Sequence, residues 1–167
     1  LDAIIFRYAE VLLIRAEAGA ELGKDPELDL TVNALRKRVG FNVKLTSSPA
    51  TDPKLVAKHP IIKGTNADLI REIRRERRVE LFGEGLRYAD LMRWGCGERL
   101  VAPKAGMMLY TDVYTPEEIA VLKTEVGTYA DGSLDVYGKR VTTPAIFESP
   151  KHYLFSLPLN EMALIPK

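Results

Sequence analysis

The pattern of apolar and charged positions is most distinctive between residues 66 and 94. Its apolar residues recur at steps of three and four, which places them on one face of a helix: Leu69, Ile70, Ile73 and Leu81. The turn that should continue this apolar stripe carries Glu76, Arg77 and Glu80 instead. The spacing therefore predicts a helix that turns part of its charge toward the core.

Two interpretations of these charges remain open. An unpaired buried ion costs several kcal/mol or more, so each inward charge needs a partner. Arg77 meets that need either at Glu80, three positions along the same helix, or at a carboxylate of a neighbouring helix. The alternative is that the charges form an ordinary solvated face. A nucleic-acid surface is disfavoured, because glutamates interleave the arginines at near-even intervals and cancel the field that phosphates need.

A pair of glycines interrupts this helix. Gly83 and Gly85 flank Glu84, and two glycines so close favour a break with a close backbone approach. A second helix is expected from Leu86 to about Trp94, the single tryptophan of the chain. We predict a helix–glycine–helix corner with Trp94 packed beneath it, locked by a structural ion network of Glu76, Arg77, Glu80, Glu84, Arg87, Asp90 and Arg93.

The first 40 residues predict a helical hairpin. Residues 7–22 have helical periodicity and stop at Gly23, a common C-terminal cap. Asp25-Pro26 then predicts a second helix, capped by Asp25, that runs to about Val39. Small residues on the first helix allow close packing, and the pair resembles a tetratricopeptide unit.

The remaining segments predict short elements joined by irregular loops. Residues 42–63 read as a connector with a brief helical turn from Asp52 or Pro53 to Lys58. Thr65 and Asp68 have the spacing of a capping box for the central helix, and Thr115 and Glu118 have it for another helix. A small β-hairpin is expected over residues 129–141, and an extended tail over residues 153–162.

Bulk composition limits the class of protein. The 167 residues fit one domain, and 46% hydrophobic with 28% charged residues is ordinary for a globular protein. A net charge of +1 gives no argument for nucleic acid or an anionic membrane. No apolar run approaches the roughly 18 residues of a membrane-spanning helix. One cysteine, Cys96, excludes an internal disulfide.

The central motif resembles the signature of the SusD/RagB family. The stretch is I-R-R-E-R-R-V-E-L-F-G-E-G-L-R-Y-A-D-L-M-R-W, and the matching positions are Glu76, Arg77, Glu80, Leu81, Glu84, Gly85, Arg87, Asp90, Leu91, Arg93 and Trp94. The N-terminal hairpin also resembles that family, with Val39 where an alanine is usual. The tail matches through Glu161 and Pro166, although Ile165 replaces the usual asparagine.

The resemblance implies a fold and a role. The fold would be mainly α and SusD-like, with tetratricopeptide-like helical hairpins, irregular loops and the small β-hairpin. Residues 1–167 would be a C-terminal SusD/RagB-type domain, a fragment of a longer chain. The whole protein would be a non-catalytic glycan- or nutrient-binding lipoprotein at the outer-membrane surface, working with a TonB-dependent SusC-like transporter. Its lipid anchor would lie outside this sequence.

Catalytic chemistry finds little support in the residues. His59 and His152 lie far apart without a partner pattern, no Cys–His pairing surrounds Cys96, and no nucleotide or hydrolase motif is present. We therefore expect no enzyme activity and no cofactor. Asp131, Ser133 and Asp135 alternate like calcium ligands, but the remaining acidic position of such a loop is missing, so no metal is expected.

Binding is the favoured class of function, and aromatic rings are its candidates. Sugars stack on exposed rings, so the candidate ligand-binding residues are the loop tyrosines Tyr110, Tyr114, Tyr129 and Tyr137. Packing of these rings on the core is the competing interpretation. A tetratricopeptide-like scaffold that binds protein partners is the alternative function, and a helical hydrolase ranks last.

Overall fold

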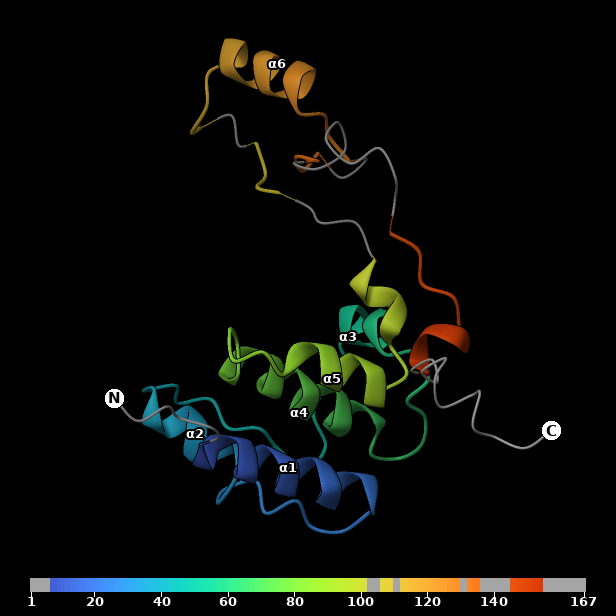
Figure 1. The fold of residues 1–167 in the computed structure, drawn as a ribbon. Coiled ribbons are helices and arrows are strands. Elements are labelled where there is room, and N and C mark those ends of the chain that lie inside the picture. The colour runs from blue at the N-terminus through green and yellow to red at the C-terminus, as the bar shows by residue number, and fades with distance from the viewer. Residues whose placement is uncertain (1–6, 102–105, 110–111, 130–131, 136–144, 155–167) are drawn as a thin grey trace, which may run out of the picture. The chain divides into compact units, whose positions relative to one another are not determined.

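The computed structural model describes residues 7–101, 106–109, 112–129, 132–135 and 145–154 (Figure 1). These residues form α1 (Tyr8–Glu21), α2 (Val32–Arg38), α3 (Pro53–Lys58), α4 (Ala67–Glu80), α5 (Arg87–Arg93) and α6 (Pro116–Glu125), with 3-10 turns η1 (Gly97–Leu100) and η2 (Lys151–Tyr153). Their β structure is limited to two isolated antiparallel bridges. The prediction of a mainly α fold is confirmed. No helix within the described ranges is both long and apolar enough to cross a bilayer.

The chain divides into two compact units, Leu1–Asp90 and Leu91–Lys167. In the first unit, α1 packs against α4 and α2, and α3 packs against α4. The two long helices run antiparallel: Arg7, before α1, bonds to Glu80 at the end of α4, while Asn66, before α4, donates to the Ala20 carbonyl. The core of this unit is Ala9, Leu12, Leu13, Ala16, Ala20, Val32, Leu35, Leu45, Ile62, Ala67, Leu69, Ile70, Ile73 and Leu81.

The apolar stripe predicted for the central helix is buried, because Leu69, Ile70 and Ile73 are at most 5% exposed. Leu81, which follows the last turn of α4, is also 5% exposed. The helical spacing of these residues thus identified the face that meets α1.

The predicted start of the second helix is wrong. Helix α2 begins at Val32, not at Pro26. The Asp25 carboxylate accepts a hydrogen bond from the Glu27 backbone N–H, and Glu27 has a φ of 48°. The Thr31 hydroxyl then donates to the carbonyls of Pro26 and Glu27. These local side-chain bonds satisfy the backbone in turns and delay the helix by six residues.

One predicted cap is also wrong, and another is confirmed. The N-cap of α4 is Asn66, without a side-chain cap bond, because Asp68 accepts from the Thr51 hydroxyl and from Arg71. Asp52 caps α3 by accepting from the Lys54 N–H. Thr115 and its glutamate partner form the expected capping box of α6.

The second unit is built around Trp94 in its described part. Trp94 is 3% exposed and clusters with Leu91 and Cys96, which are also buried. The guanidinium of Arg93 lies 4.8 Å from the Trp94 ring centroid. In the same unit, the Phe147 ring packs edge to face against the Tyr153 ring, whose hydroxyl accepts a hydrogen bond from the Gly97 N–H at 2.8 Å.

The predicted small β-hairpin is partly within the described residues. Thr128 pairs antiparallel with Leu134 across a turn at Gly132, and Met108 forms a second bridge to Ser133. Residues 130–131 and 136–141 of the predicted hairpin and residues 155–162 of the predicted tail lie outside the described residues. The predicted extended start of the tail is wrong at Tyr153, which lies in the 3-10 turn η2.

Candidate functional site

The predicted helix–glycine–helix corner is formed by residues 81–86, a glycine elbow that joins α4 to α5. Gly83 and Gly85 have φ values of 82° and 78°, in the left-handed region that glycine occupies without steric cost. Leu81 caps α4 and is buried, so the chain leaves the helix in a fixed direction. The elbow thereby returns α5 toward the charged end of α4.

Arg77 is a buried side chain of α4 that bonds to residues of other helices beside the elbow. Its guanidinium Nε lies 2.9 Å from both Asp90 carboxylate oxygens, and its Nη2 lies 3.4 Å from Glu10 Oε1. Arg77 and Asp90 are each 4% exposed. Of the two partners left open by the sequence, Arg77 thus pairs with carboxylates on α5 and α1. One side chain connects three helices, which a solvated face does not do.

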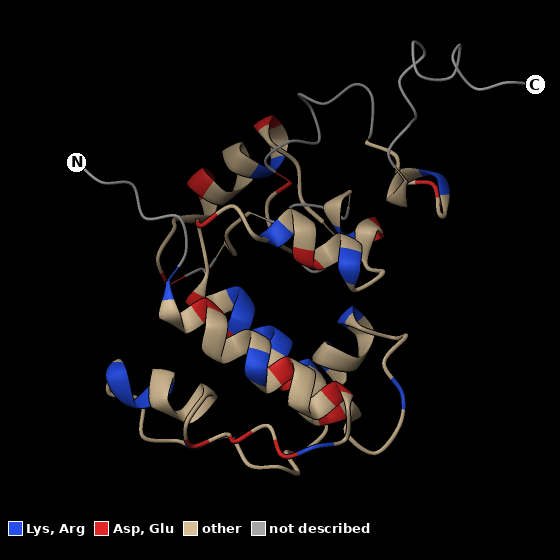
Figure 2. Ribbon diagram, turned by 60° about the horizontal axis from the view of Figure 1, so that its bottom comes forward, with Lys and Arg blue, Asp and Glu red and all other residues tan. Residues whose placement is uncertain are grey.

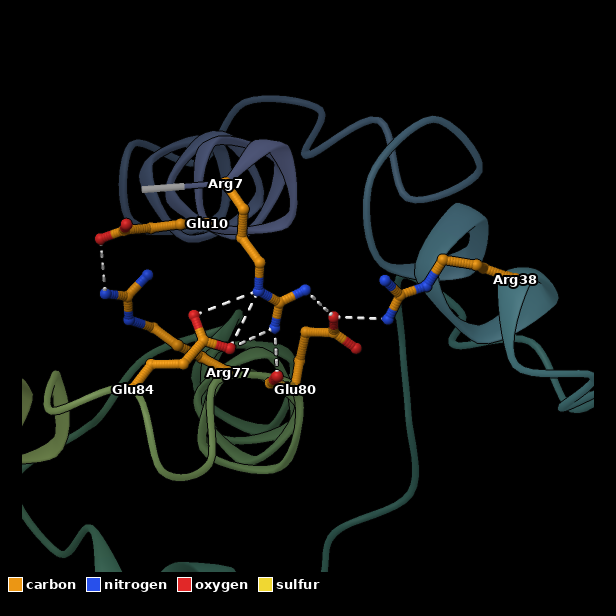
Figure 3. Close-up of polar contacts among 6 residues, drawn as sticks. All are labelled: Arg7, Glu10, Arg38, Arg77, Glu80 and Glu84. Atoms are coloured by element: carbon orange, nitrogen blue, oxygen red, sulfur yellow. Dashed lines mark hydrogen bonds and ion pairs between the residues drawn. The ribbon is translucent and has the colours of Figure 1, made fainter. Parts of the chain in front are cut away.

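Arg7 forms a second centre beside Arg77 (Figure 3). Its Nε donates to Glu84 Oε1 at 2.9 Å, its Nη1 donates to Glu80 at 2.5 Å, and its Nη2 donates to the Glu80 carbonyl. Arg38 of α2 reaches the same Glu80 at 2.6 Å. Glu80 and Glu84 are therefore joined to segments more than 40 residues away in sequence.

Hydrogen bonding at this centre changes two pKa values. The Glu84 and Glu80 carboxylates raise the pKa of Arg7, with Glu84 as the largest cause. The Arg7 guanidinium in turn lowers the pKa of Glu84 below the ordinary glutamate value. The pair stays ionised throughout the physiological pH range.

Basic and acidic residues are interspersed along α4 (Figure 2). Glu76 pairs with Arg36 of α2 at 2.5 Å, and Arg74 pairs with Glu17 of α1 at 3.2 Å. Glu72 is 7% exposed, and burial raises its pKa although Arg75 lies 2.5 Å away. Helix α4 therefore meets α1 and α2 through ion pairs as well as apolar contacts.

The other residues of the predicted network differ in their surroundings. The Asp90 carboxylate accepts a hydrogen bond from Arg77. The exposed Arg93 lies over the Trp94 ring, and Arg87 is half-buried. The Arg7, Glu10, Arg36 and Arg38 partners were missed by the sequence interpretation. No local spacing could have identified them, because each lies at least 40 residues from its partner.

The tyrosine candidates are only partly described. Tyr114 is half-buried, and its hydroxyl donates to Met107 Sδ at 3.3 Å. Tyr129 is also half-buried and donates to Asp135 at 2.8 Å. Tyr110 and Tyr137 lie outside the described residues. A ligand role for the four tyrosines stays a prediction.

Two hollows flank Phe41, which follows α2. The first, of about 570 Å³, lies between α2 and α4 and is lined by Leu35, Arg36, Val39, Gly40, Phe41, Arg75, Glu76, Val79 and Glu80. The second, also about 570 Å³, is lined by Asp29, Asn33, Ala34, Arg36, Lys37, Phe41, Asn42, Val43 and Lys44. Phe41 and Arg36 line both hollows, so the exposed ring stands on the boundary between them.

The residues considered for catalysis or metal binding are buried or lie in different units of the chain. His59 is 4% exposed, and the Cys96 thiol, equally buried, donates to the Trp94 carbonyl. His152 belongs to the second unit, where its Nδ1 accepts from the Glu148 N–H. Within the ranges that the structure describes, no three His, Cys, Asp or Glu residues are grouped to hold a metal ion. Asp131 of the calcium-like pattern lies outside those ranges.

Comparisons with known proteins give one consistent result. The SusD family model matches residues 2–166. A SusD-like protein of Formosa agariphila is 35% identical over 106 residues, covering 64% of this chain and 20% of the relative. The crystal structure of a SusD-like carbohydrate binding protein from Bacteroides fragilis superposes with a TM-score of 0.61 and 30% identity, covering 96% of this chain and 27% of that one. The chain thus spans about a fifth to a quarter of these relatives' lengths.

Proposed function

The chain belongs to the SusD family, and on that basis we propose that it is part of a non-catalytic glycan- or nutrient-binding protein exposed at the outer-membrane surface. Residues 1–167 would be the C-terminal domain of that longer protein. It would work with a TonB-dependent SusC-like transporter and be held to the membrane by a lipid anchor outside this sequence.

The family match over residues 2–166 is the observation that carries the proposal. The solved relative that shares the fold is described as a carbohydrate binding protein. The ion pairs of α4 fit a supporting role for this region. Arg77, Glu80 and Glu84 of the motif are engaged with other protein groups, so they act in holding helices together and not in chemistry on a ligand.

Glycan binding is tested on the full-length protein. A glycan array followed by calorimetry with the best oligosaccharide should give saturable binding. Mass spectrometry of the same sugar after long incubation should give the unchanged oligosaccharide. Absence of binding across neutral and acidic glycans contradicts the proposal, and shortened products contradict its non-catalytic part.

The partnership and the location need separate measurements. Affinity purification of the tagged full-length protein from outer membranes should enrich a TonB-dependent transporter. Protease treatment of intact cells should remove the protein while periplasmic markers survive. Resistance of the protein to protease in intact cells contradicts surface exposure.

A scaffold that binds protein partners is the second candidate function. It is favoured by an apolar stripe on α1, where Tyr8, Val11 and Ile14 are spaced by three and are 73%, 48% and 51% exposed. Binding of an amphipathic helical peptide by a protein that binds no sugar would support the scaffold. Sugar binding without peptide binding supports glycan capture.

A further inference from the structure

Phe41 has the environment of a ligand platform. Its ring is 52% exposed, and the Arg36 guanidinium lies 5.4 Å from the ring centroid. Arg36 is itself fixed by Glu76 at 2.5 Å and by the Val43 carbonyl at 2.9 Å. A ring supported in this way keeps its orientation while part of its surface meets solvent. Hollows on both sides of the ring then provide room for a ligand.

The size and lining of the hollows indicate the class of ligand. Each measures about 570 Å³, within the range of roughly 300–1,000 Å³ for small-molecule sites. Val39 and Val79 add exposed apolar surface on the α4 side, at 66% and 70% exposure. Asn42 and Lys37 add exposed polar groups on the other side. Apolar surface beside hydrogen-bonding groups suits the C–H faces and hydroxyls of a sugar ring.

The charges of the α2–α4 hollow beside Phe41 favour an uncharged ligand there. The α2–α4 hollow is lined by two cations and two anions, Arg36, Arg75, Glu76 and Glu80, whose formal charges cancel. Glu76 pairs with Arg36, and Glu80 pairs with Arg7 and Arg38. In the other hollow, Lys44 pairs with Asp29 at 2.9 Å, and Lys37 is an exposed cation. An ionic ligand in the α2–α4 hollow would have to displace the pairs of Glu76 and Glu80, because these pairs satisfy one another.

We propose that Phe41 and its two flanking hollows form a contact site for a neutral oligosaccharide, with a pyranose ring stacked on Phe41 and its hydroxyls bonded by Asn42 and Lys37. The site rests on the proposed glycan-binding function and assigns part of it to this chain. Sequence patterns did not indicate it, because Phe41 ends the family-like stretch N-A-L-R-K-R-V-G-F and no spacing of residues marked its ring as a ligand contact.

The test compares two exposed phenylalanines in the full-length protein. Neutral gluco-, manno-, xylo- and galacto-oligosaccharides and acidic uronic or sulfated oligosaccharides are screened on an array, and the best binder is titrated by calorimetry. Phe41→Ala should weaken its affinity about tenfold, the scale of a lost aromatic contact. Phe41→Tyr should keep the affinity, and Asn42→Ala should weaken it. Phe82→Ala is the control, because Phe82 is 87% exposed and lines neither hollow.

The outcomes separate this inference from the function on which it rests. A wild-type protein that binds no glycan overturns both. Unchanged affinity in Phe41→Ala and Asn42→Ala overturns the site while glycan capture stands. An equal loss in Phe82→Ala also overturns the site, because the effect is then not specific to the hollows. Asn42→Ala decides the matter if Phe41→Ala does not fold, and a sole preference for acidic glycans overturns the neutral class.

Discussion

At the scale of single residues, this chain places charges where apolar side chains usually pack. Arg71, Glu72, Arg74 and Arg77 are all at most 7% exposed on α4. Burying such ions is costly, and the cost is offset only when partners and hydrogen bonds replace water. Arg77 has two carboxylate partners, and Arg71 has Asp68 and the Ile62 carbonyl, while Arg77 Nη1 and Arg71 Nε make no hydrogen bond among the described residues. The pairs therefore fix which helices meet, and removal of one partner should be costly.

Arg77→Ala should lower the free energy of unfolding by roughly 2–4 kcal/mol, because it leaves the buried Asp90 carboxylate without its partner. A urea melt measures the change. Arg78→Ala is the matched control: Arg78 is the next residue of α4 and is exposed, so its loss should cost no more than about 0.5 kcal/mol. Equal effects in the two variants would mean that Arg77 is solvated.

Glu84 should make the protein less stable in acid. Its pKa in the folded state is lowered by Arg7, so its contribution is present above the ordinary value of about 4.3 and is lost as pH falls through the folded value. Glu84→Gln should therefore reduce the difference between the melting temperatures at pH 7 and pH 3. A difference as large as that of the wild type would exclude this pair as a source of the acid sensitivity.

Glu72 should have the opposite effect of pH on stability from that of Glu84. Burial raises its pKa, so the folded state holds the proton more tightly and stability falls as pH rises from about 4.3 through the folded value. Glu72→Gln should raise the melting temperature at pH 7 relative to the wild type, with a smaller effect at pH 4. A lower melting temperature at pH 7 would show that the Arg75 pair outweighs burial.

At the scale of helices, a helix end that is set by hydrogen bonds of nearby side chains can be predicted from the sequence. Asp52-Pro53 begins α3, and Thr115-Pro116 begins α6 with both bonds of the capping box. Helix α6 has no buried residue in the described part of the chain, so its cap is a larger share of its stability than for α4.

Removal of the cap should open α6 locally. Glu118→Ala removes the carboxylate that accepts from the Thr115 N–H at 2.9 Å, and should cost about 1 kcal/mol of local stability. Hydrogen exchange of α6 peptides measures this loss. Glu117→Ala removes the same charge from the same turn without touching the box. Equal acceleration by both variants would attribute the effect to helix-dipole charge alone.

What the sequence could predict depends on the distance between interacting residues. Periodicity identified the buried face of α4, because Leu69, Ile70 and Ile73 lie within two turns. It could not identify Arg7 as the partner of Glu84, since these residues are 77 positions apart. The turn at Glu27 also escaped prediction, because several weak local bonds compete there with a helix start.

The candidate site was less predictable than the fold. The motif residues of α4 were named as an ion network, but the partners on α1 and α2 come only from the packing of the helices. The structure places the ring of Phe41 beside two hollows, whereas the sequence interpretation selected tyrosines in predicted loops. A hollow is a property of several elements together, so residue type alone does not reveal it.

At the scale of the whole molecule, the described residues form two apolar cores. The first contains Leu13 and Ile73, which are fully buried in the unit Leu1–Asp90. The second contains Leu91 and Trp94 in the unit Leu91–Lys167. Separate cores are the physical basis for separate cooperative units, in which a cavity weakens mainly the unit that contains it.

Two core variants should therefore act on different parts of the chain. Ile73→Ala and Leu91→Ala each create a cavity that costs about 2–5 kcal/mol, because both side chains are at most 3% exposed. In hydrogen exchange, Ile73→Ala should speed exchange mainly in α1 and α4, and Leu91→Ala mainly in the residues around Trp94. The reciprocal design makes each variant the control for the other. Uniform acceleration over the whole chain by both would mean that the two units unfold as one, and the ion pairs of α4 would then support all 167 residues together.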